Sequence, residues 1–139
     1  MINSESEELP PEGADASLRF EWPIRALAQD ADVQRSLFPA FACVADELAL
    51  DFEECLRTVV ASGRTATFSE SEARRVRELD AKLADISGLE HQDLWTDDAL
   101  RGSRRRDEVR AAARQALIAF GWSSLPPPLG RNIYVGPER

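Results

Sequence analysis

The segment that most constrains the fold is FSESEARRVRELDAKLADISG, residues 68–88. Ser69 followed by Glu72 is typical of a capping box at a helix N-terminus, and Gly88 suits the C-terminal cap. Between these signals the apolar residues recur every three or four positions, at Val76, Leu79, Leu83 and Ile86. The pattern predicts an amphipathic helix that must bury one face against other helices.

Two more long helices are predicted from the same periodicity. The first runs from Ala40 to Ala61 and ends at Ser62-Gly63. Its apolar face is predicted to carry Phe41, Val44, Ala45, Leu48, Phe52, Cys55, Leu56 and Val59. The second runs from Ser103 to Phe120 and ends at Gly121. Its inward residues are predicted to be Val109, Ala113, Ala116, Leu117 and Phe120.

Shorter helices are expected between these segments. Pro23 suits the first turn of a helix over residues 23–29, because the missing proline N–H has no partner there anyway. Asp30 or Asp32 would cap a second helix over residues 32–38, and Thr96 would cap a third. The fold class is therefore all-α, as an irregular antiparallel bundle of about four to six helices.

Both ends of the chain differ in composition from the middle. Residues 1–18 are acidic and poor in apolar groups, which predicts a flexible tail. Residues 19–139 are expected to form a single helical domain. Within it, residues 122–139 contain three consecutive prolines and should lie extended over the bundle, with a possible strand at residues 132–135.

Composition restricts the kind of partner. The formal net charge is -8 at pH 7, which argues against nucleic acids and anionic membranes, since both need a positive surface. Such a field attracts a basic protein. The N-terminus lacks the basic start and apolar run of a secretory signal, and no apolar run is long enough to cross a bilayer. We therefore expect a cytoplasmic protein.

The segment FACVADELALDFEECL, residues 41–56, carries the candidate binding residues. Its carboxylates are Asp46, Glu47, Asp51, Glu53 and Glu54. Neither Lys nor Arg occurs in residues 36–56, and helical spacing places Leu50 among the acids, away from the apolar face. An apolar anchor with charges around it has the core-and-rim layout of a protein-binding patch. The alternative is that another segment covers Leu50 and the acids are simply solvated.

Catalytic, metal and cofactor sites are not expected. His91 is the only histidine and has no ligand partner at zinc spacing, so no metal is predicted. Because the chain has a single histidine, a nucleophile–histidine pair could form only if the fold happened to bring a nucleophile next to His91. No glycine-rich phosphate loop is present, so no nucleotide cofactor is predicted. The acids of residues 41–56 are expected to face solvent rather than to work as buried acid–base groups.

The stretch RGSRRRDEVRAAAR, residues 101–114, has six arginines and two acids. Cations in the first turn of a helix oppose its macrodipole. Either the helix begins nearer Asp107, or carboxylates elsewhere hold the arginines. Internal pairing with Asp97, Asp98 or the acidic helix is preferred here over RNA binding.

The segments LFPAFACVADELALDFEECL and DLWTDDALRGSRRRDEVRAAARQALIAFGW resemble parts of small, acidic, helical bacterial proteins. Some of those proteins are immunity proteins of contact-dependent or polymorphic toxin systems. The resemblance covers about residues 20–122. It lies in the acidic, helical character of the segments rather than in a diagnostic motif. It implies a small acidic protein that binds a basic toxin domain, often a nuclease, and blocks its active site.

Charge and resemblance together predict a non-enzymatic module that neutralises a cationic toxin domain. Its partner-binding residues would be Asp46, Glu47, Leu50, Asp51, Glu53 and Glu54. One alternative is a structural or regulatory homodimer in which the acidic helix meets the arginine-rich helix of a second copy. A small enzyme that uses the carboxylates is a further alternative, and it would require buried acids with raised pKa values.

Overall fold

A computed structural model describes the backbone of residues 12–128 and the side chains of residues 20–128 other than residue 89. All regular structure in this range is helical, which confirms the predicted all-α class. No helix in the described range combines the length and the apolar character needed to cross a membrane. The elements are α1 (Glu12–Leu27), α2 (Ala31–Ser36), α3 (Val44–Ala61), the 3-10 helix η1 (Arg64–Thr67), α4 (Glu70–Asp85), the 3-10 helix η2 (Leu89–Leu94), α5 (Asp97–Gly102) and α6 (Arg104–Phe120).

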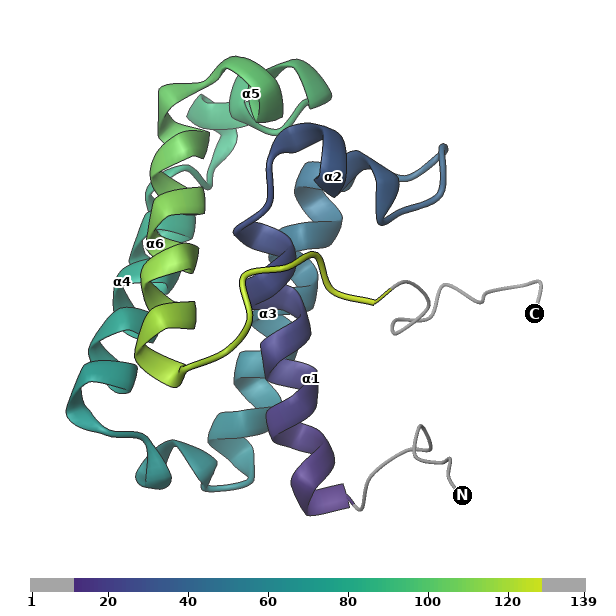
Figure 1. Ribbon diagram of the computed structural model, residues 1–139. Coiled ribbons are helices and arrows are strands. Elements are labelled where there is room, and N and C mark those ends of the chain that lie inside the picture. Colours follow the sequence, from purple (N-terminus) through teal and green to yellow (C-terminus); the bar gives the residue numbers. More distant parts are fainter. Residues whose placement is uncertain (1–11, 129–139) are drawn as a thin grey trace, which may run out of the picture.

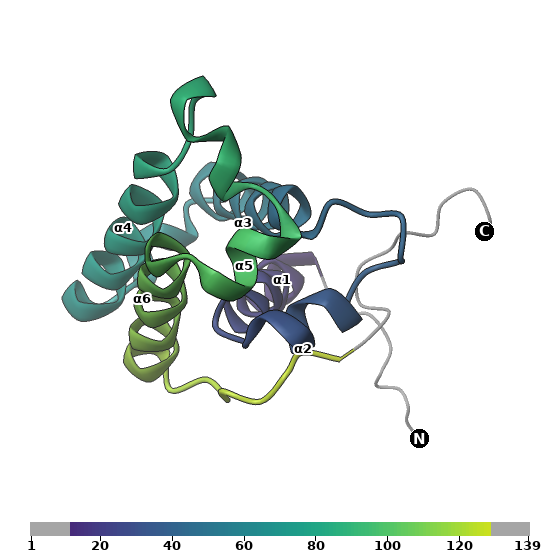
Figure 2. The same cartoon turned by 90° about the horizontal axis from the view of Figure 1, so that it is seen from above.

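The four long helices form a bundle in which α1 packs against both α3 and α6, and α4 packs against α6 (Figure 1). Seen along the bundle, α3, α1, α6 and α4 follow one another around the core (Figure 2). The short helices α2 and α5 lie together at one end of the bundle. The α4–α5 connection, which contains η2, lies at that same end of the bundle and leads from the end of α4 to α5 (Figure 1).

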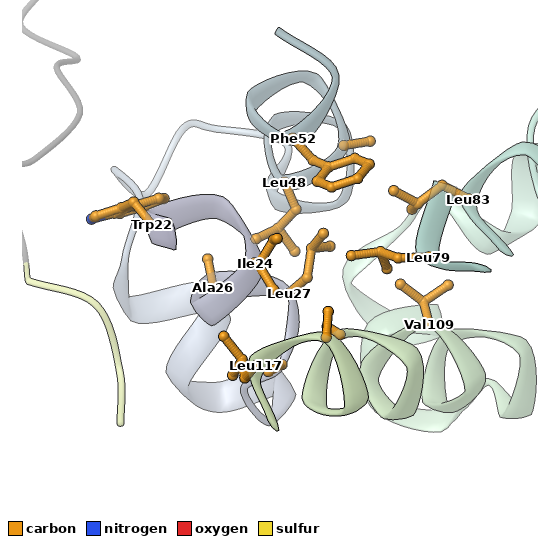
Figure 3. Close-up of a cluster of buried hydrophobic side chains, with 14 of the residues drawn as sticks. Trp22, Ile24, Ala26, Leu27, Leu48, Phe52, Leu79, Leu83, Val109 and Leu117 are labelled. Atoms are coloured by element: carbon orange, nitrogen blue, oxygen red, sulfur yellow. The ribbon is translucent and has the colours of Figure 1, made fainter. Parts of the chain in front are cut away.

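The core lies between the long helices, and each contributes an apolar stripe (Figure 3). The largest fully buried side chains are Phe20, Phe52, Ile24, Leu27, Leu48, Leu79, Ile86, Leu117, Val44, Val59 and Pro23. Burial of each of the larger ones stabilises the fold by roughly 1.5–3 kcal/mol relative to exposure. The stripes predicted from the sequence for α3, α4 and α6 are therefore the faces that pack, with one exception in α3 described below.

The local signals of α4, α5 and α6 are confirmed, with one shift. Ser69 and Glu72 form the reciprocal capping box of α4, and the Thr96 hydroxyl accepts from the first turn of α5. Gly121, with φ of 70°, terminates α6. Gly88 is not the C-cap of α4, because the helix ends earlier and Ile86 takes that position. Gly88 instead precedes η2 with φ of 109°, a left-handed conformation that favours glycine.

The N-terminal prediction needs correction. Residues 12–18 do not belong to the flexible tail that composition predicts, and the first helix does not begin at Pro23. Helix α1 begins at Glu12, and Pro23 lies inside it. Pro23 removes one intrahelical hydrogen bond. Buried Phe20 and Trp22 precede it, and their packing stabilises the turn that local rules disfavour. The remaining part of the predicted tail, residues 1–11, lies outside the described residues.

Helix α3 begins at Val44 rather than at Ala40, and Phe41 does not lie on its apolar face. Phe41 is 89% exposed in the loop before the helix. The physical cause is Arg35, whose guanidinium donates to the carbonyl oxygens of Pro39 (2.7 Å), Ala40 (2.8 Å) and Ala42 (3.0 Å). These bonds hold residues 39–42 as a loop, so the helix starts only after them.

The segment after α6 lies extended across α1, as predicted for its described part (Figure 1). Trp22 Nε1 donates to the Pro128 carbonyl at 2.8 Å. Arg25 donates to the carbonyls of Leu125 (2.9 Å) and Pro126 (2.9 Å). Because prolines cannot donate backbone hydrogen bonds, the segment is held through its carbonyl oxygens. Residues 129–139, including the possible strand at 132–135, lie outside the described range.

Candidate protein-binding site

The outer face of α3 carries two parallel rows of side chains. Residues seven apart stand two turns apart on the same side of a helix, about 10 Å along the axis. One row contains Asp46, Leu50 and Glu53, all exposed, with Leu50 at 56% exposure. The other row contains the partly buried Glu47 and Asp51 and the exposed Glu54. The first row is thus the more accessible of the two.

A cleft opens beside the first row. Its volume is about 480 Å³, and α3 supplies Asp46, Ala49, Leu50 and Glu53 to it. The α4–α5 connection supplies the other wall, with Ser87, Gly88, Gln92 and Trp95. Neither Lys nor Arg is among these described lining residues. Within residues 20–128, no ion pair joins the two lining carboxylates to a cation. The cleft is therefore a negatively charged depression with an aliphatic wall.

Hydrogen bonds fix the wall opposite α3. The Trp95 indole Nε1 donates to the Ile86 carbonyl at 2.6 Å, and the Ser87 hydroxyl donates to the Leu83 carbonyl at 2.9 Å. Both bonds tie the connection to the C-terminal end of α4. A wall held in this way loses little conformational entropy when something binds against it.

Arg106 supports the same wall from inside the protein. Its guanidinium carbon lies 4.5 Å from the centroid of the Trp95 ring, and its Nε donates to the Leu94 carbonyl at 3.0 Å. Burial, reinforced by nearby Arg110, lowers the pKa of Arg106 to about 10, while the Asp46 carboxylate opposes that shift. Arg106 therefore stays charged at neutral pH, and Asp46 contributes to keeping it so.

Asp51 is not the solvated carboxylate that the sequence predicted. It is partly buried, and this burial, together with the like charges of Glu47 and Glu54, raises its pKa to about 7. Asp51 is not among the residues that line the cleft. The predicted binding set therefore divides: Asp46, Leu50 and Glu53 share the cleft, whereas Glu47, Asp51 and Glu54 form the row beside it.

Two arginines of the stretch, Arg106 and Arg110, are buried inside the fold, and within residues 20–128 neither forms an ion pair with the predicted carboxylates. Buried Arg110 donates from Nε to the Gln29 carbonyl (2.7 Å) and from Nη2 to the Leu100 carbonyl (2.9 Å). Its Nη1 pairs with Asp107 at 2.6 Å. These carbonyls lie at or just beyond helix ends, where backbone oxygens lack intrahelical partners.

Arg105 and Arg114 are less buried but also donate to backbone carbonyl oxygens. Arg114 donates to the Ala28 carbonyl at 2.9 Å and pairs with Asp30 at 3.2 Å, and Arg105 donates to the Asp85 carbonyl at 3.1 Å. Helix α6 starts at residue 104 rather than nearer residue 107, because the residue 103 hydroxyl accepts from two backbone N–H groups of the first turn. Asp97 pairs instead with Arg35, at 3.5 Å.

The described residues contain no group of three or more His, Cys, Asp and Glu side chains placed to hold a metal ion. The second wall of the cleft was not predicted from the sequence. Its residues lie about forty positions after those of α3 and come together only through the packing of the bundle. Gly88, the residue before η2, was the one local signal of an unusual backbone there.

Comparison with known proteins found no matching family model, no matching curated protein and no matching solved structure.

Proposed function

We propose that this chain is a non-enzymatic binding module that recognises a cationic protein through the outer face of α3. The observation that carries the proposal is Leu50. This side chain is 56% exposed between Asp46 and Glu53, at a cleft with no cation among its described lining residues. Solvated helix faces usually mix charges of both signs. An aliphatic anchor with acids on both sides gives a partner dry contact area and steers it electrostatically.

The partner class that best fits this surface is a basic toxin domain, with the chain acting as its immunity protein in the cytoplasm. The support is the net charge of -8 together with the resemblance in texture to small acidic immunity proteins. Binding would place the acidic face over a positively charged active site, as in a nuclease that binds phosphate groups. Inhibition would follow from occupation of that site, without chemistry by this chain.

The homodimer alternative receives less support. It requires the cations of α6 to be available to a second copy, yet Arg106 and Arg110 are buried and Arg114 already binds Ala28 and Asp30 in the loop after α1. Arg104 is exposed, but it is a single cation. A small enzyme is supported only by the raised pKa of Asp51, which does not line the cleft.

The test needs a cationic partner, and the probe is a basic C-terminal domain of a secreted protein, to be sought in the reading frames beside this gene. We expect Leu50→Ala to weaken binding of that domain at least tenfold by biolayer interferometry, since hot-spot anchors contribute about 2 kcal/mol or more. Ile118→Ala is the matched control, because Ile118 is 70% exposed on α6 and does not line this cleft. Equal affinity for the wild type and Leu50→Ala would remove α3 from the interface.

A further inference from the structure

We infer that the α3 cleft, defined by Asp46, Leu50, Glu53 and Trp95, is a receptor for one arginine side chain presented by the partner. This inference rests on the proposed function and names the group that the site recognises. It does not rest on acidity alone, because the open cleft also has an aliphatic surface at Ala49 and Leu50 and an aromatic side chain at Trp95. Its volume of about 480 Å³ falls in the range typical of sites for small groups, roughly 300–1,000 Å³.

The carboxylates stand at the two ends of the α3 wall. Asp46 and Glu53 are two helical turns apart, with the aliphatic side chains of Ala49 and Leu50 between them. A guanidinium binds a carboxylate through two parallel N–H···O bonds, and its three-carbon stem packs on aliphatic surface. One arginine can therefore satisfy one carboxylate while its stem covers Leu50.

The opposite wall adds negative charge and an aromatic surface. A Cβ built on Gly88 would lie 3.0 Å from Glu90 Oε1, so the Glu90 carboxylate sits directly against this glycine of the wall. The chain itself already places one guanidinium, that of Arg106, over the Trp95 ring. Trp95 also lines the cleft, and an aromatic side chain attracts a planar cation.

An arginine suits these walls better than a lysine. The guanidinium is planar, carries five donors in a fixed fork and is less strongly hydrated than an ammonium group. Both the paired oxygens of a carboxylate and the flat ring of Trp95 match that shape. On α3 the acidic row ends at Glu53, and Arg57 follows one turn later. Arg57 is exposed and does not line the cleft.

The probe is N-acetyl-arginine methylamide, titrated into the 15N-labelled full-length chain. We expect saturable chemical-shift changes at the Leu50 amide and the Trp95 indole N–H, with a millimolar dissociation constant. The citrulline analogue has the same shape without the charge and should bind at least tenfold more weakly. The lysine analogue should be weaker than arginine. Equal shifts with citrulline, or shifts that never saturate, would overturn the inference.

A matched pair of variants locates the effect. Asp46→Asn/Glu53→Gln should weaken binding of the arginine probe at least tenfold. Glu70→Gln/Asp80→Asn removes the same charge from exposed positions of α4 and should leave binding within twofold. Equal losses in both double variants would mean that only net charge matters. If the probe fails while Leu50→Ala still weakens the basic partner, the arginine receptor is wrong and the proposed function stands.

Discussion

The acidic outer face of α3 and the arginine-rich helix α6 concentrate charges of opposite sign, and the fold places those charges differently. In α6, Arg106 and Arg110 turn inward and are among the most buried polar residues described, whereas Arg104 and Arg114 stay exposed. On α3 the carboxylates of Asp46 and Glu53 stay exposed beside a cleft. The difference follows from side-chain length and chemistry. An arginine reaches past the apolar layer with five donors, whereas a carboxylate is short and only accepts.

In this protein, a run of charged residues forms an exposed charged surface only where the side chains do not bind groups inside the fold. The short helices and turns of this bundle end in carbonyls that lack helical partners, and arginines satisfy many of them. On α3, by contrast, the exposed carboxylates of Asp46 and Glu53 form no ion pair with a cation of residues 20–128. Net negative charge therefore gathers at the α3 surface even though the chain contains many arginines.

The largest effect is expected from Arg110→Met. This substitution removes donors to the Gln29 and Leu100 carbonyls and leaves those oxygens buried without partners. We expect a loss of about 3 kcal/mol in the free energy of unfolding, measured by urea denaturation. Arg104→Met, at an exposed position of the same helix, should change it by less than about 0.5 kcal/mol. Similar values for both variants would break the contrast between internal and surface charge.

Asp51→Asn is expected to act in the opposite direction. Removing this charge relieves burial of a carboxylate and its repulsion by Glu47 and Glu54. The variant should be more stable than the wild type by about 1–2 kcal/mol at pH 8. The gain is limited to this size because solvent screens part of the repulsion at a partly buried site. Thermal denaturation would measure the gain. A loss of stability instead would show that the charged form of Asp51 supports the fold.

The pH dependence of that gain has a defined sign. The pKa of Asp51 is about 7 in the folded protein against 3.8 as the ordinary value, so the folded state binds this proton more tightly. Stability contributed by this group is therefore present at low pH and falls as pH rises through this interval. The difference between Asp51→Asn and the wild type should vanish near pH 4 and be complete by pH 8. A difference independent of pH would exclude titration of Asp51 as its cause.

The smallest effect on stability is expected from Asp46→Asn/Glu53→Gln. Both carboxylates are exposed, and within residues 20–128 neither forms an ion pair with a cation of the chain. Urea denaturation should show a change below about 0.5 kcal/mol in either direction. Asp46 weakly favours charged Arg106, so any change should come mainly from that residue. A loss above about 1 kcal/mol would make these acids structural rather than available for binding.

Signals that act within one turn of helix were predictable from the sequence. The Ser69–Glu72 box, the Thr96 cap and the Gly121 terminus depend on neighbouring backbone groups, and all three are confirmed. The predicted start of α3 at Ala40 was wrong, and Phe41 lies in a loop instead. Arg35 binds the carbonyl oxygens that a helix would otherwise use there. Such competition between a side chain and the helix depends on how the loop closes, which periodicity does not report.

The candidate site was predictable only in half. Helical spacing correctly placed Leu50 away from the core face, and it is exposed. The same spacing could not show that Asp51 is partly buried, nor that Ser87 and Trp95 face Leu50 across a cleft. Those facts depend on how α4 and its connection pack beside α3, and no local pattern in residues 41–56 reports that packing.

The most direct test of the central claim is the association rate of the basic partner domain with the chain at low and high salt. For the wild type, the association rate should fall steeply between 20 mM and 500 mM NaCl. The screening length is roughly 10 Å at 0.1 M and shortens as salt is added, so the field that steers the partner is lost. Asp46→Lys/Glu53→Lys should associate at least tenfold more slowly at low salt and depend little on salt. Equal low-salt rates for the two proteins would contradict recognition through the α3 face.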